Sequence, residues 1–325
     1  MPPAYLKGAA FGFVAASIWA SWSVVTRLAI TTGLDASDIV ALRFAVAGVL
    51  LSPLVIRRGL ARDRLGWLRL GVLIAGVGAP YALVAATALR FAPAYDGGAL
   101  NPGCMPLFVA VIAAIVLGEK PPATRIFGLA LILAGAVTIV GWHAEERGTA
   151  WSAARTFGDV LFLIAAFLTA CFTLVMRQAK LDPLHATALV STGSLVIYLP
   201  IYLVLQGARL AQVPVADLAV QALFQGVAVS ILALVLYGRA VLILGASRGA
   251  AFGALVPALS ALFAMPLLGE WPGATDWVGI LLISAGVYLA SGGPLPRWQR
   301  RKSVTAATEL PGDASDRSGM PAARR

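Results

Sequence analysis

The chain has 325 residues, of which 59% are hydrophobic and only 12% are charged, and its mean hydropathy is +0.85. No single soluble core could bury so much apolar surface, so the composition excludes an ordinary soluble domain and favours a protein that lies in a lipid bilayer. The net charge of +10 is divided mainly between the loops that separate long apolar segments and the last 29 residues. This pattern indicates membrane topology rather than a nucleic-acid-binding surface.

Ten apolar segments follow one another along the chain, most of them close to the roughly 20 residues that a helix needs to cross a bilayer. Because backbone groups in lipid must be hydrogen-bonded within the chain, each segment is predicted to be a helix. The first follows Lys7 and resembles a signal peptide, but it is long enough to span and no small-residue cleavage site follows it. The fifth and tenth segments are short. The segments cover residues 6–26, 39–56, 67–89, 97–117, 126–142, 158–176, 186–205, 218–244, 249–268 and 277–291.

The two cysteines, Cys104 and Cys171, both lie within these apolar segments. Their spacing fits neither a disulfide framework nor a metal site, so they are interpreted as small buried residues. No metal ion, no cofactor and no catalytic residue is expected.

The distribution of Lys and Arg predicts how the segments are oriented. With the amino terminus inside, the inner loops hold eleven Lys and Arg residues and the outer loops hold five. Both termini are therefore predicted to lie in the cytoplasm, in a multi-pass protein of the plasma (inner) membrane. Residues 293–325 are polar and without periodicity, and they are predicted to form a disordered basic cytoplasmic tail.

One phrase is written twice in the chain. LGEKPPATRIFGLALILAG begins at Leu117, and LGEWPGATDWVGILLISAG begins at Leu268. Residues 96–141 and 247–292 match at 17 of 46 positions without a gap, and Arg27 faces Arg177 in a weaker alignment of the earlier segments. The chain is therefore predicted to consist of two related halves.

Each half holds five segments, and an odd number of spans forces the second half into the membrane inverted. Equivalent loops then face opposite sides, which explains why Arg125 of the first copy becomes Asp276 in the second. The predicted fold is an all-α polytopic membrane protein of ten transmembrane helices in two inverted five-helix repeats. The predicted parts are a first repeat at 1–142, an external linker at 143–157, a second repeat at 158–292 and the tail at 293–325.

These motifs resemble those of EamA-type members of the drug/metabolite transporter superfamily. The resemblance covers about residues 6–292. It rests on LRFAVAGVLLSPL from Leu42, ALRFAPA from Ala88, and Pro106 followed by LGE and GLALILAG, with Pro257, LGE and GILLISAG in the second copy. It implies a ten-helix plasma-membrane carrier with both ends inside, often an exporter of amino acids or other metabolites.

Helices that are interrupted at corresponding places in both halves point to a central binding site. The fourth and ninth segments are rich in Gly and Pro, and helix breaks are predicted at Pro102, Pro106 and Pro257. Such breaks free backbone carbonyls that must line a cavity or find partners. The alternative is a packing kink at which small residues let helices approach closely.

Three polar residues within the segments are candidates for function. Arg43 is predicted to bind a substrate carboxylate or phosphate, to gate the path, or to pair with Asp96. Asp96 is the candidate for proton coupling, with a helix cap as the alternative. Asn101, which precedes a proline, resembles the start of a helix whose positive end would face the cavity, although a plain contact between helices is an alternative.

Further candidates for the lining of a binding site are aromatic residues and one amide. Trp19, Tyr81 and Tyr237 offer an apolar face with a polar group, which suits a modest-sized organic solute, but packing or lipid-facing roles fit them equally. Gln225 can hydrogen-bond a ligand or a neighbouring helix. Glu119 and Glu270, at repeated helix ends, are interpreted as capping residues.

The predicted function is secondary active transport by alternating access, with export of a small organic metabolite such as an amino acid or a related compound. Coupling to protons is left open. No Gly-rich GxxxxGK[ST] loop is present in the sequence, so ATP is not the expected direct energy source. Two alternatives stay open: an intramembrane enzyme that acts on a lipid-soluble substrate, and a non-transporting membrane sensor. The expected partners are a small-molecule substrate and the bilayer, without nucleic acid, and a homodimer is left open.

Overall fold

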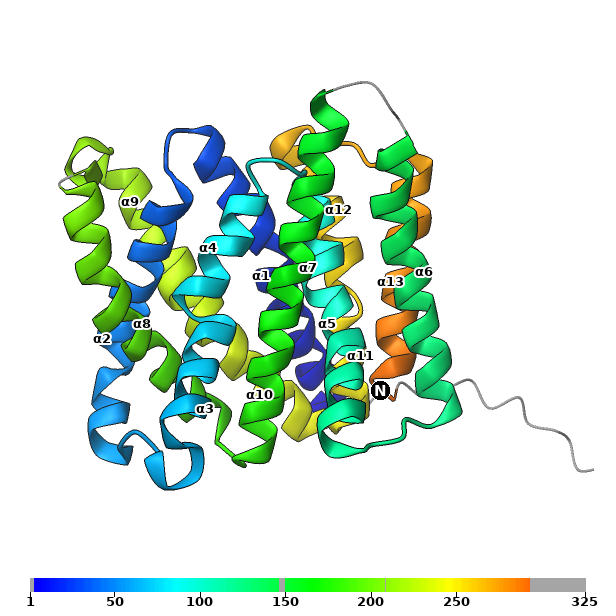
Figure 1. Cartoon of the computed structure of the whole chain (residues 1–325), viewed down its shortest axis with the longest axis horizontal. Coiled ribbons are helices and arrows are strands. Elements are labelled where there is room, and N and C mark those ends of the chain that lie inside the picture. Colours follow the sequence, from blue (N-terminus) through cyan, green and yellow to red (C-terminus); the bar gives the residue numbers. More distant parts are fainter. Residues whose placement is uncertain (1–2, 146–149, 208, 293–325) are drawn as a thin grey trace, which may run out of the picture. The chain divides into compact units, whose positions relative to one another are not determined.

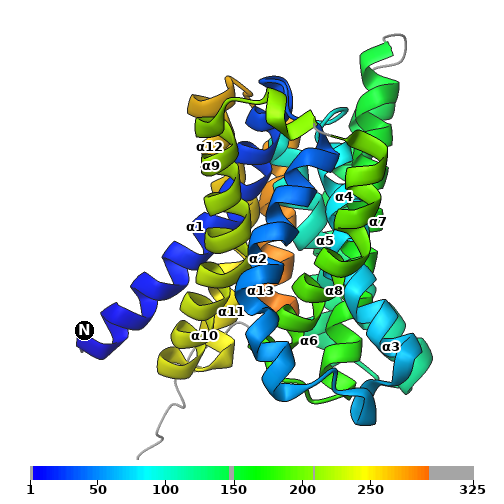
Figure 2. The same ribbon diagram turned by 90° about the vertical axis from the view of Figure 1, so that its left-hand side faces the viewer.

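The computed structural model describes residues 3–145, 150–207 and 209–292, and every regular element within them is a helix (Figure 1). The helices lie side by side, with their connections at two opposite ends (Figures 1 and 2). The elements up to residue 145 are α1 (Pro3–Thr31), α2 (Ala36–Arg58), α3 (Arg62–Val77), α4 (Ala79–Ala88), α5 (Ala94–Leu117) and α6 (Ala123–Glu145). Those that follow are α7 (Ala150–Gln178), α8 (Pro183–Gln206), the 3-10 helix η1 (Arg209–Gln212), α9 (Val215–Gln221), the π-helix η2 (Ala222–Leu232), α10 (Ala233–Leu244), α11 (Ala246–Gly253), α12 (Val256–Leu268) and α13 (Ala274–Ala290).

Nine helical stretches of the described residues are long and apolar enough to cross a membrane, and α13, at 17 residues, is a shorter apolar helix. Large apolar side chains cover their outer faces, as Leu242 at 82% exposed and Val204 at 84% exposed illustrate. This surface suits lipid and would be unfavourable in water. The chain is therefore an all-helical, multi-pass membrane protein.

The predicted tail, 293–325, lies outside the described residues. The predicted linker, 143–157, differs from the structure, because α6 continues to Glu145 and α7 already begins at Ala150. Much of that segment is therefore helical, which brings Arg155 into a helix rather than a loop.

The repeated motif forms the contact between α6 and α13, which pack extensively against each other. A Cβ atom added to Gly135 would lie 2.6 Å from the backbone oxygen of Gly279, and one added to Gly286 would lie 2.6 Å from that of Gly128. The absence of these side chains lets the two backbones touch. Since residue numbers rise along one helix as they fall along the other, α6 and α13 are antiparallel.

The predicted breaks at Pro102 and Pro106 are wrong, because α5 runs without interruption through both prolines. The helix starts at Ala94, so Asn101 lies inside it and does not begin a new helix. Neighbouring helices hold α5 closely: a Cβ added to Gly98 would lie 2.2 Å from Ser260 on α12. A proline inside such a packed helix removes one hydrogen bond without ending the helix.

The third and eighth spans contain the interruptions instead. The third changes from α3 to α4 at Gly78, whose backbone is extended, and the N–H of Ala79 donates to Ser194 Oγ on α8 at 3.0 Å. The eighth span passes through the π-helix η2. In the ninth span a break does precede Pro257, which lies at the start of α12.

Candidate substrate cavity and buried polar network

A cavity of about 230 Å³ lies among α1, α2, α3, α7, α8, η2 and α10. Both interrupted spans reach it, the third through Val77, beside the break at Gly78, and the eighth through Val229 and Ser230 of the π-helix. The lining is mostly apolar, with one charged group, which is the usual character of a site for a small organic ligand. Its residues are Trp19, Arg43, Phe44, Val77, Phe172, Met176, Pro183, Thr187, Val190, Ser191, Val229, Ser230 and Leu234.

Arg43 is the charged group of this cavity. Its Nε donates to Ser230 Oγ at 3.2 Å, and its guanidinium carbon lies 5.4 Å from the centre of the Phe44 ring. Among the described residues it forms no ion pair with an acidic side chain. The predicted alternative, a pair with Asp96, is wrong, because the Asp96 carboxylate binds another arginine.

The other predicted lining residues divide between the cavity and the packed interior. Trp19 lines the cavity, and Tyr237 packs against it with ring centres 5.2 Å apart. Tyr81 accepts a hydrogen bond from Asn101 Nδ2 at 2.9 Å, and neither residue lines the cavity.

Gln225 lies in the packed interior rather than at the cavity surface. It is fully buried, accepts from Trp22 Nε1 at 3.0 Å and donates to Thr26 Oγ1 at 3.0 Å and to Gln221. Its amide is therefore used in joining α1 to η2.

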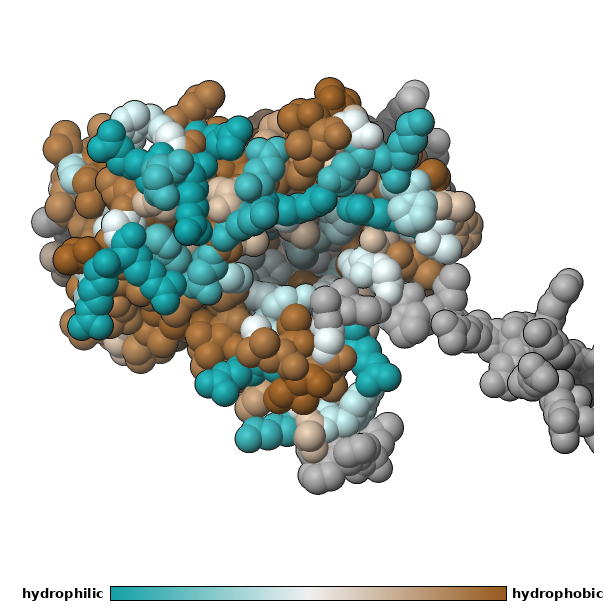
Figure 3. Space-filling view, turned by 90° about the horizontal axis from the view of Figure 1, so that it is seen from below, coloured by the Kyte–Doolittle hydropathy of each residue, from teal (hydrophilic) through white to brown (hydrophobic). Residues whose placement is uncertain are grey.

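The cavity extends toward one end of the bundle, since Met176 and Pro183 flank the connection between α7 and α8. Figure 3 views this end, where hydrophilic residues surround a hollow near the centre of the face. The exposed basic residues at or near the α2–α3, α5–α6 and α7–α8 connections, which lie at this end, are Arg57, Arg58, Arg62, Arg64, Arg69, Lys120, Arg177 and Lys180.

A larger hollow of about 510 Å³ lies beside η1 and is open to the outside. Its arginine, Arg209, is already paired with Asp35 and Asp38. No aromatic side chain is among the described residues that line it. The smaller cavity is therefore the better candidate for a substrate site.

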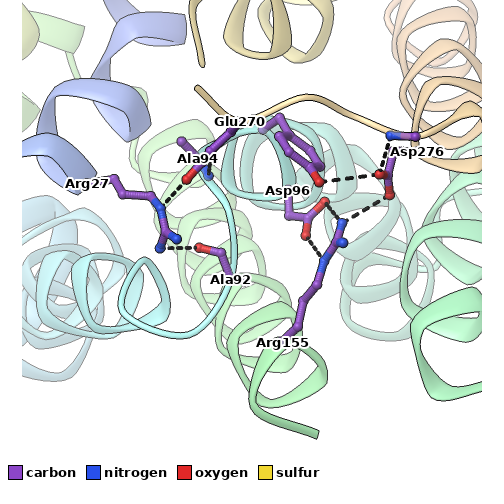
Figure 4. A network of polar contacts seen from close by, with 9 residues as sticks. Arg27, Ala92, Ala94, Asp96, Arg155, Glu270 and Asp276 are labelled. Carbon is purple, nitrogen blue, oxygen red and sulfur yellow. Dashed lines mark hydrogen bonds and ion pairs between the residues drawn. The ribbon is translucent and has the colours of Figure 1, made fainter. Parts of the chain in front are cut away.

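A buried polar network closes the opposite end of the bundle (Figure 4). Arg155 on α7 donates to both oxygens of Asp96 on α5, at 2.7 and 3.1 Å, and to Asp276 on α13 at 3.0 Å. Tyr95 donates to Asp276 at 3.3 Å, and Asp276 also accepts the N–H of Gly273 at 2.8 Å. One guanidinium thus joins three helices, and its side chain is only 10% exposed.

A second pair lies beside this network in Figure 4. Arg27 at the end of α1 binds Glu270, which follows α12, and donates to the carbonyls of Leu89 and Ala92. The other oxygen of Glu270 accepts the N–H of Ala94, the first residue of α5, at 2.7 Å. Glu270 is predicted to be a capping residue, but its contacts extend further, because it connects α1, α5 and α12.

The far end of α5 carries the corresponding pair. Glu119, which follows α5, binds Arg177 at the end of α7. These residues are the repeat equivalents of Glu270 and Arg27, so each half supplies the arginine for the glutamate of the other. The Arg27 and Glu270 side chains are 14% exposed, whereas those of Arg177 and Glu119 are 54% and 36% exposed. One end is sealed while the other is open to the outside.

Asp159 lies one turn along α7 from Arg155 and is fully buried. Neither of its oxygens accepts a hydrogen bond from a described residue. Its carboxyl lies close enough to that of Asp96 for a hydrogen bond if one of the two carries a proton. Sequence reasoning missed Asp159, although an acidic residue inside an apolar segment is itself a signal of function.

Membrane-crossing helices around a cavity of metabolite size are the architecture expected of a membrane transporter. A model of the EamA-like transporter family matches residues 6–141 and 156–292, and the chain belongs to this family. The resemblance inferred from the sequence motifs is thus confirmed. The family and its relatives' names indicate transport rather than catalysis.

Two relatives and one solved structure illustrate the similarity. An uncharacterized transporter of Archaeoglobus fulgidus is 29% identical over 278 residues, covering 84% of this chain and 93% of the relative. A probable terminal-alkyne amino-acid exporter of Streptantibioticus cattleyicolor is 29% identical over 289 residues, covering 85% and 91%. A crystal structure at 20% identity covers 87% of this chain and 96% of its own with a TM-score of 0.56, which shows a shared fold.

Proposed function

We propose that the protein is a secondary active transporter that exports a small carboxylate-bearing metabolite, such as an amino acid, across the plasma membrane. The observation that carries this proposal is Arg43, a guanidinium in the cavity that no described acidic side chain neutralises. An unpaired charge within the membrane is costly, so such a group is generally retained for a ligand. A substrate carboxylate matches the planar donor set of arginine.

The size and lining of the cavity support a small substrate. At about 230 Å³ it is smaller than the cavities that hold drug-sized ligands. Trp19 and Phe44 offer apolar contact beside Arg43, which fits an amino acid with an apolar side chain. The Streptantibioticus relative is named as a probable terminal-alkyne amino-acid exporter, which agrees with this substrate class.

The antiparallel contact of α6 and α13 and the exchanged arginine–glutamate pairs support the proposal that the two halves are inverted repeats. The basic residues around the hollow in Figure 3 support placing that end, and both termini, in the cytoplasm. The structure then corresponds to an inward-facing state, with the cavity extending toward the cytoplasmic end and the outer end closed. Rocking of the halves would bury the Arg177 pair and release the Arg27 pair.

The test compares the transport of an amino acid with that of the matching amine, which lacks the carboxylate. Purified protein in liposomes without ATP is expected to catalyse counterflow of radiolabelled leucine, and not of isoamylamine, which lacks the carboxylate. Arg43→Ala should raise the Km for leucine at least tenfold, the equivalent of about 1.4 kcal/mol, because the charge-assisted hydrogen bonds are lost. Arg57→Ala, an exposed arginine on the same helix, should leave the Km unchanged.

Two results would count against the proposal. Equal transport of leucine and isoamylamine would remove Arg43 from substrate recognition. An absence of counterflow for a full set of labelled amino acids, with folded protein in the liposomes, would reject amino-acid transport.

A further inference from the structure

Among the described residues of the buried network at the closed end, carboxyl groups outnumber guanidinium groups. Three carboxyl groups, Asp96, Asp159 and Asp276, surround the single guanidinium of Arg155. The relative exposures of the three aspartates are 0%, 0% and 4%. With all three ionised, three negative charges and one positive charge would lie together among these four described side chains in a buried site, where like charges repel strongly.

The hydrogen bonds identify the carboxyl that can hold a proton. Asp96 binds Arg155 through both oxygens, and Asp276 binds Arg155, Tyr95 and the backbone of Gly273. Asp159 alone has two oxygens without a donor, and it faces Asp96. A proton on Asp159 would supply the missing hydrogen bond to Asp96 and remove one negative charge.

We infer that Asp159 is a proton-binding site that closes the outer end of the transporter. The inference rests on the proposed function, and it moves the proton from the predicted Asp96 to its neighbour. With a proton, Asp159 donates to Asp96, and the contacts among α5, α7 and α13 are complete. Without it, Asp96 and Asp159 repel each other, and opening relieves the repulsion by admitting water.

A proton fits this site better than a metal ion. Arg155 lies between Asp96 and Asp276 and would repel a cation bound by both. No group of three His, Cys, Asp or Glu side chains in the described part of the chain is arranged to hold a metal. The charged groups described around Asp159 are Asp96 on α5, Arg155 on its own helix and Asp276 on α13. Tyr95 on α5 is bonded to Asp276, and the Arg27–Glu270 pair lies beside the Asp96–Arg155–Asp276 contacts in Figure 4.

The experiment measures opening directly and needs no transported solute. Spin labels at Ala153→Cys on α7 and Trp271→Cys before α13, both exposed positions, report the separation of these helices in full-length protein whose Cys104 and Cys171 are replaced by alanine. In this parent, raising the pH is expected to increase the population with a long distance. A shift caused by Na⁺ at constant pH, without a pH response, would overturn the inference.

Variants test whether the pH response comes from Asp159 or from another residue. Asp159→Asn should hold the short distance at every pH, because its amide donates to Asp96 as a protonated carboxyl would. Asp159→Glu should retain a pH response, and Asp217→Asn, an exposed residue on α9, should behave like the parent. An unchanged pH response in Asp159→Asn, or no response in the parent, would refute the inference.

An infrared measurement on the wild-type protein covers the case in which a variant fails to fold. A C=O band of a protonated carboxylic acid is expected to remain at roughly pH 6, where exposed carboxyl groups are ionised, and to disappear as the pH is raised further; its absence at roughly pH 6 would exclude the site. Because neither measurement involves leucine, a failure of leucine counterflow would leave this result intact, and the reverse also holds.

Discussion

Replacing Arg155 with glutamine should shift the transporter strongly toward an open outer end. The variant removes two bonds to Asp96 and one to Asp276, and leaves both carboxylates buried without the charge of Arg155. Removal of one partner from a buried ion pair costs about 3–5 kcal/mol, and here the cost falls only on the closed state, because opening lets water reach the carboxylates. The ratio of open to closed protein should therefore rise by about 10² to 5 × 10³-fold.

The spin-label pair at Ala153 and Trp271 provides the assay for this variant. Arg155→Lys, which keeps the charge but loses the bidentate geometry, should give an intermediate shift. Arg90→Gln is the matched control, because its pair with Asp35 is 45% and 25% exposed and such pairs contribute at most about 1 kcal/mol. If Arg155→Gln moves the distance distribution no more than Arg90→Gln does, the network is not what holds the outer end closed.

Two further predictions concern stability, measured by thermal unfolding of the detergent-solubilised protein through tryptophan fluorescence. Gly135→Ala should lower stability by about 1–3 kcal/mol, because the added methyl group meets the backbone of α13, whereas Gly71→Ala, with no atom within 4 Å of its Cβ, should not lower it; equal effects would contradict the contact described for α6. Glu270→Gln should destabilise the protein more than Glu119→Gln by about 1–3 kcal/mol, although the two glutamates occupy equivalent places in the repeat. The reason is that Glu270 is less exposed, at 14% against 36%, and is bonded to the start of α5. Matching losses for both glutamates would remove the inferred difference between the two ends.

The sequence predicts the helices of this protein well because a bilayer imposes a simple rule. Backbone groups in hydrocarbon must be satisfied locally, so each apolar run of sufficient length becomes a helix, and the short tenth segment corresponds to the short α13. The positions at which helices are interrupted are harder to predict from the sequence. Pro102 and Pro106 are tolerated within α5, whereas the third span is interrupted at Gly78, where Ser194 from α8 accepts the freed N–H of Ala79. The partner that stabilises that interruption lies more than 100 positions away in the chain.

The candidate site was predictable only in part for the same reason. Arg43 and Trp19 are identified from the cost and chemistry of their side chains alone, and both line the cavity. Arg155, the partner of Asp96, could not be identified in this way, because the sequence places it in a predicted loop. In the structure α7 already begins at Ala150, so Arg155 lies within a helix. Asp276, interpreted from the repeat as a marker of topology, gains its second role only when α13 meets α7.

Two ion pairs that are equivalent in the repeat are buried to different degrees, and this difference relates the repeat to the opening and closing of the two ends. Arg27 with Glu270 and Arg177 with Glu119 use the same residue types at opposite ends of α5, yet only the first pair is enclosed. A pair gains strength as water leaves it, so the closed end is held by a strong contact and the open end by a weak one. If the halves exchange conformations, the same chemistry holds the other end closed, and two states of similar energy arise from one repeated sequence. The described acidic residues at the Arg177 end form no counterpart of the Asp96, Asp159 and Asp276 cluster. A proton bound to this cluster would therefore stabilise only the state in which the Arg155 end is closed.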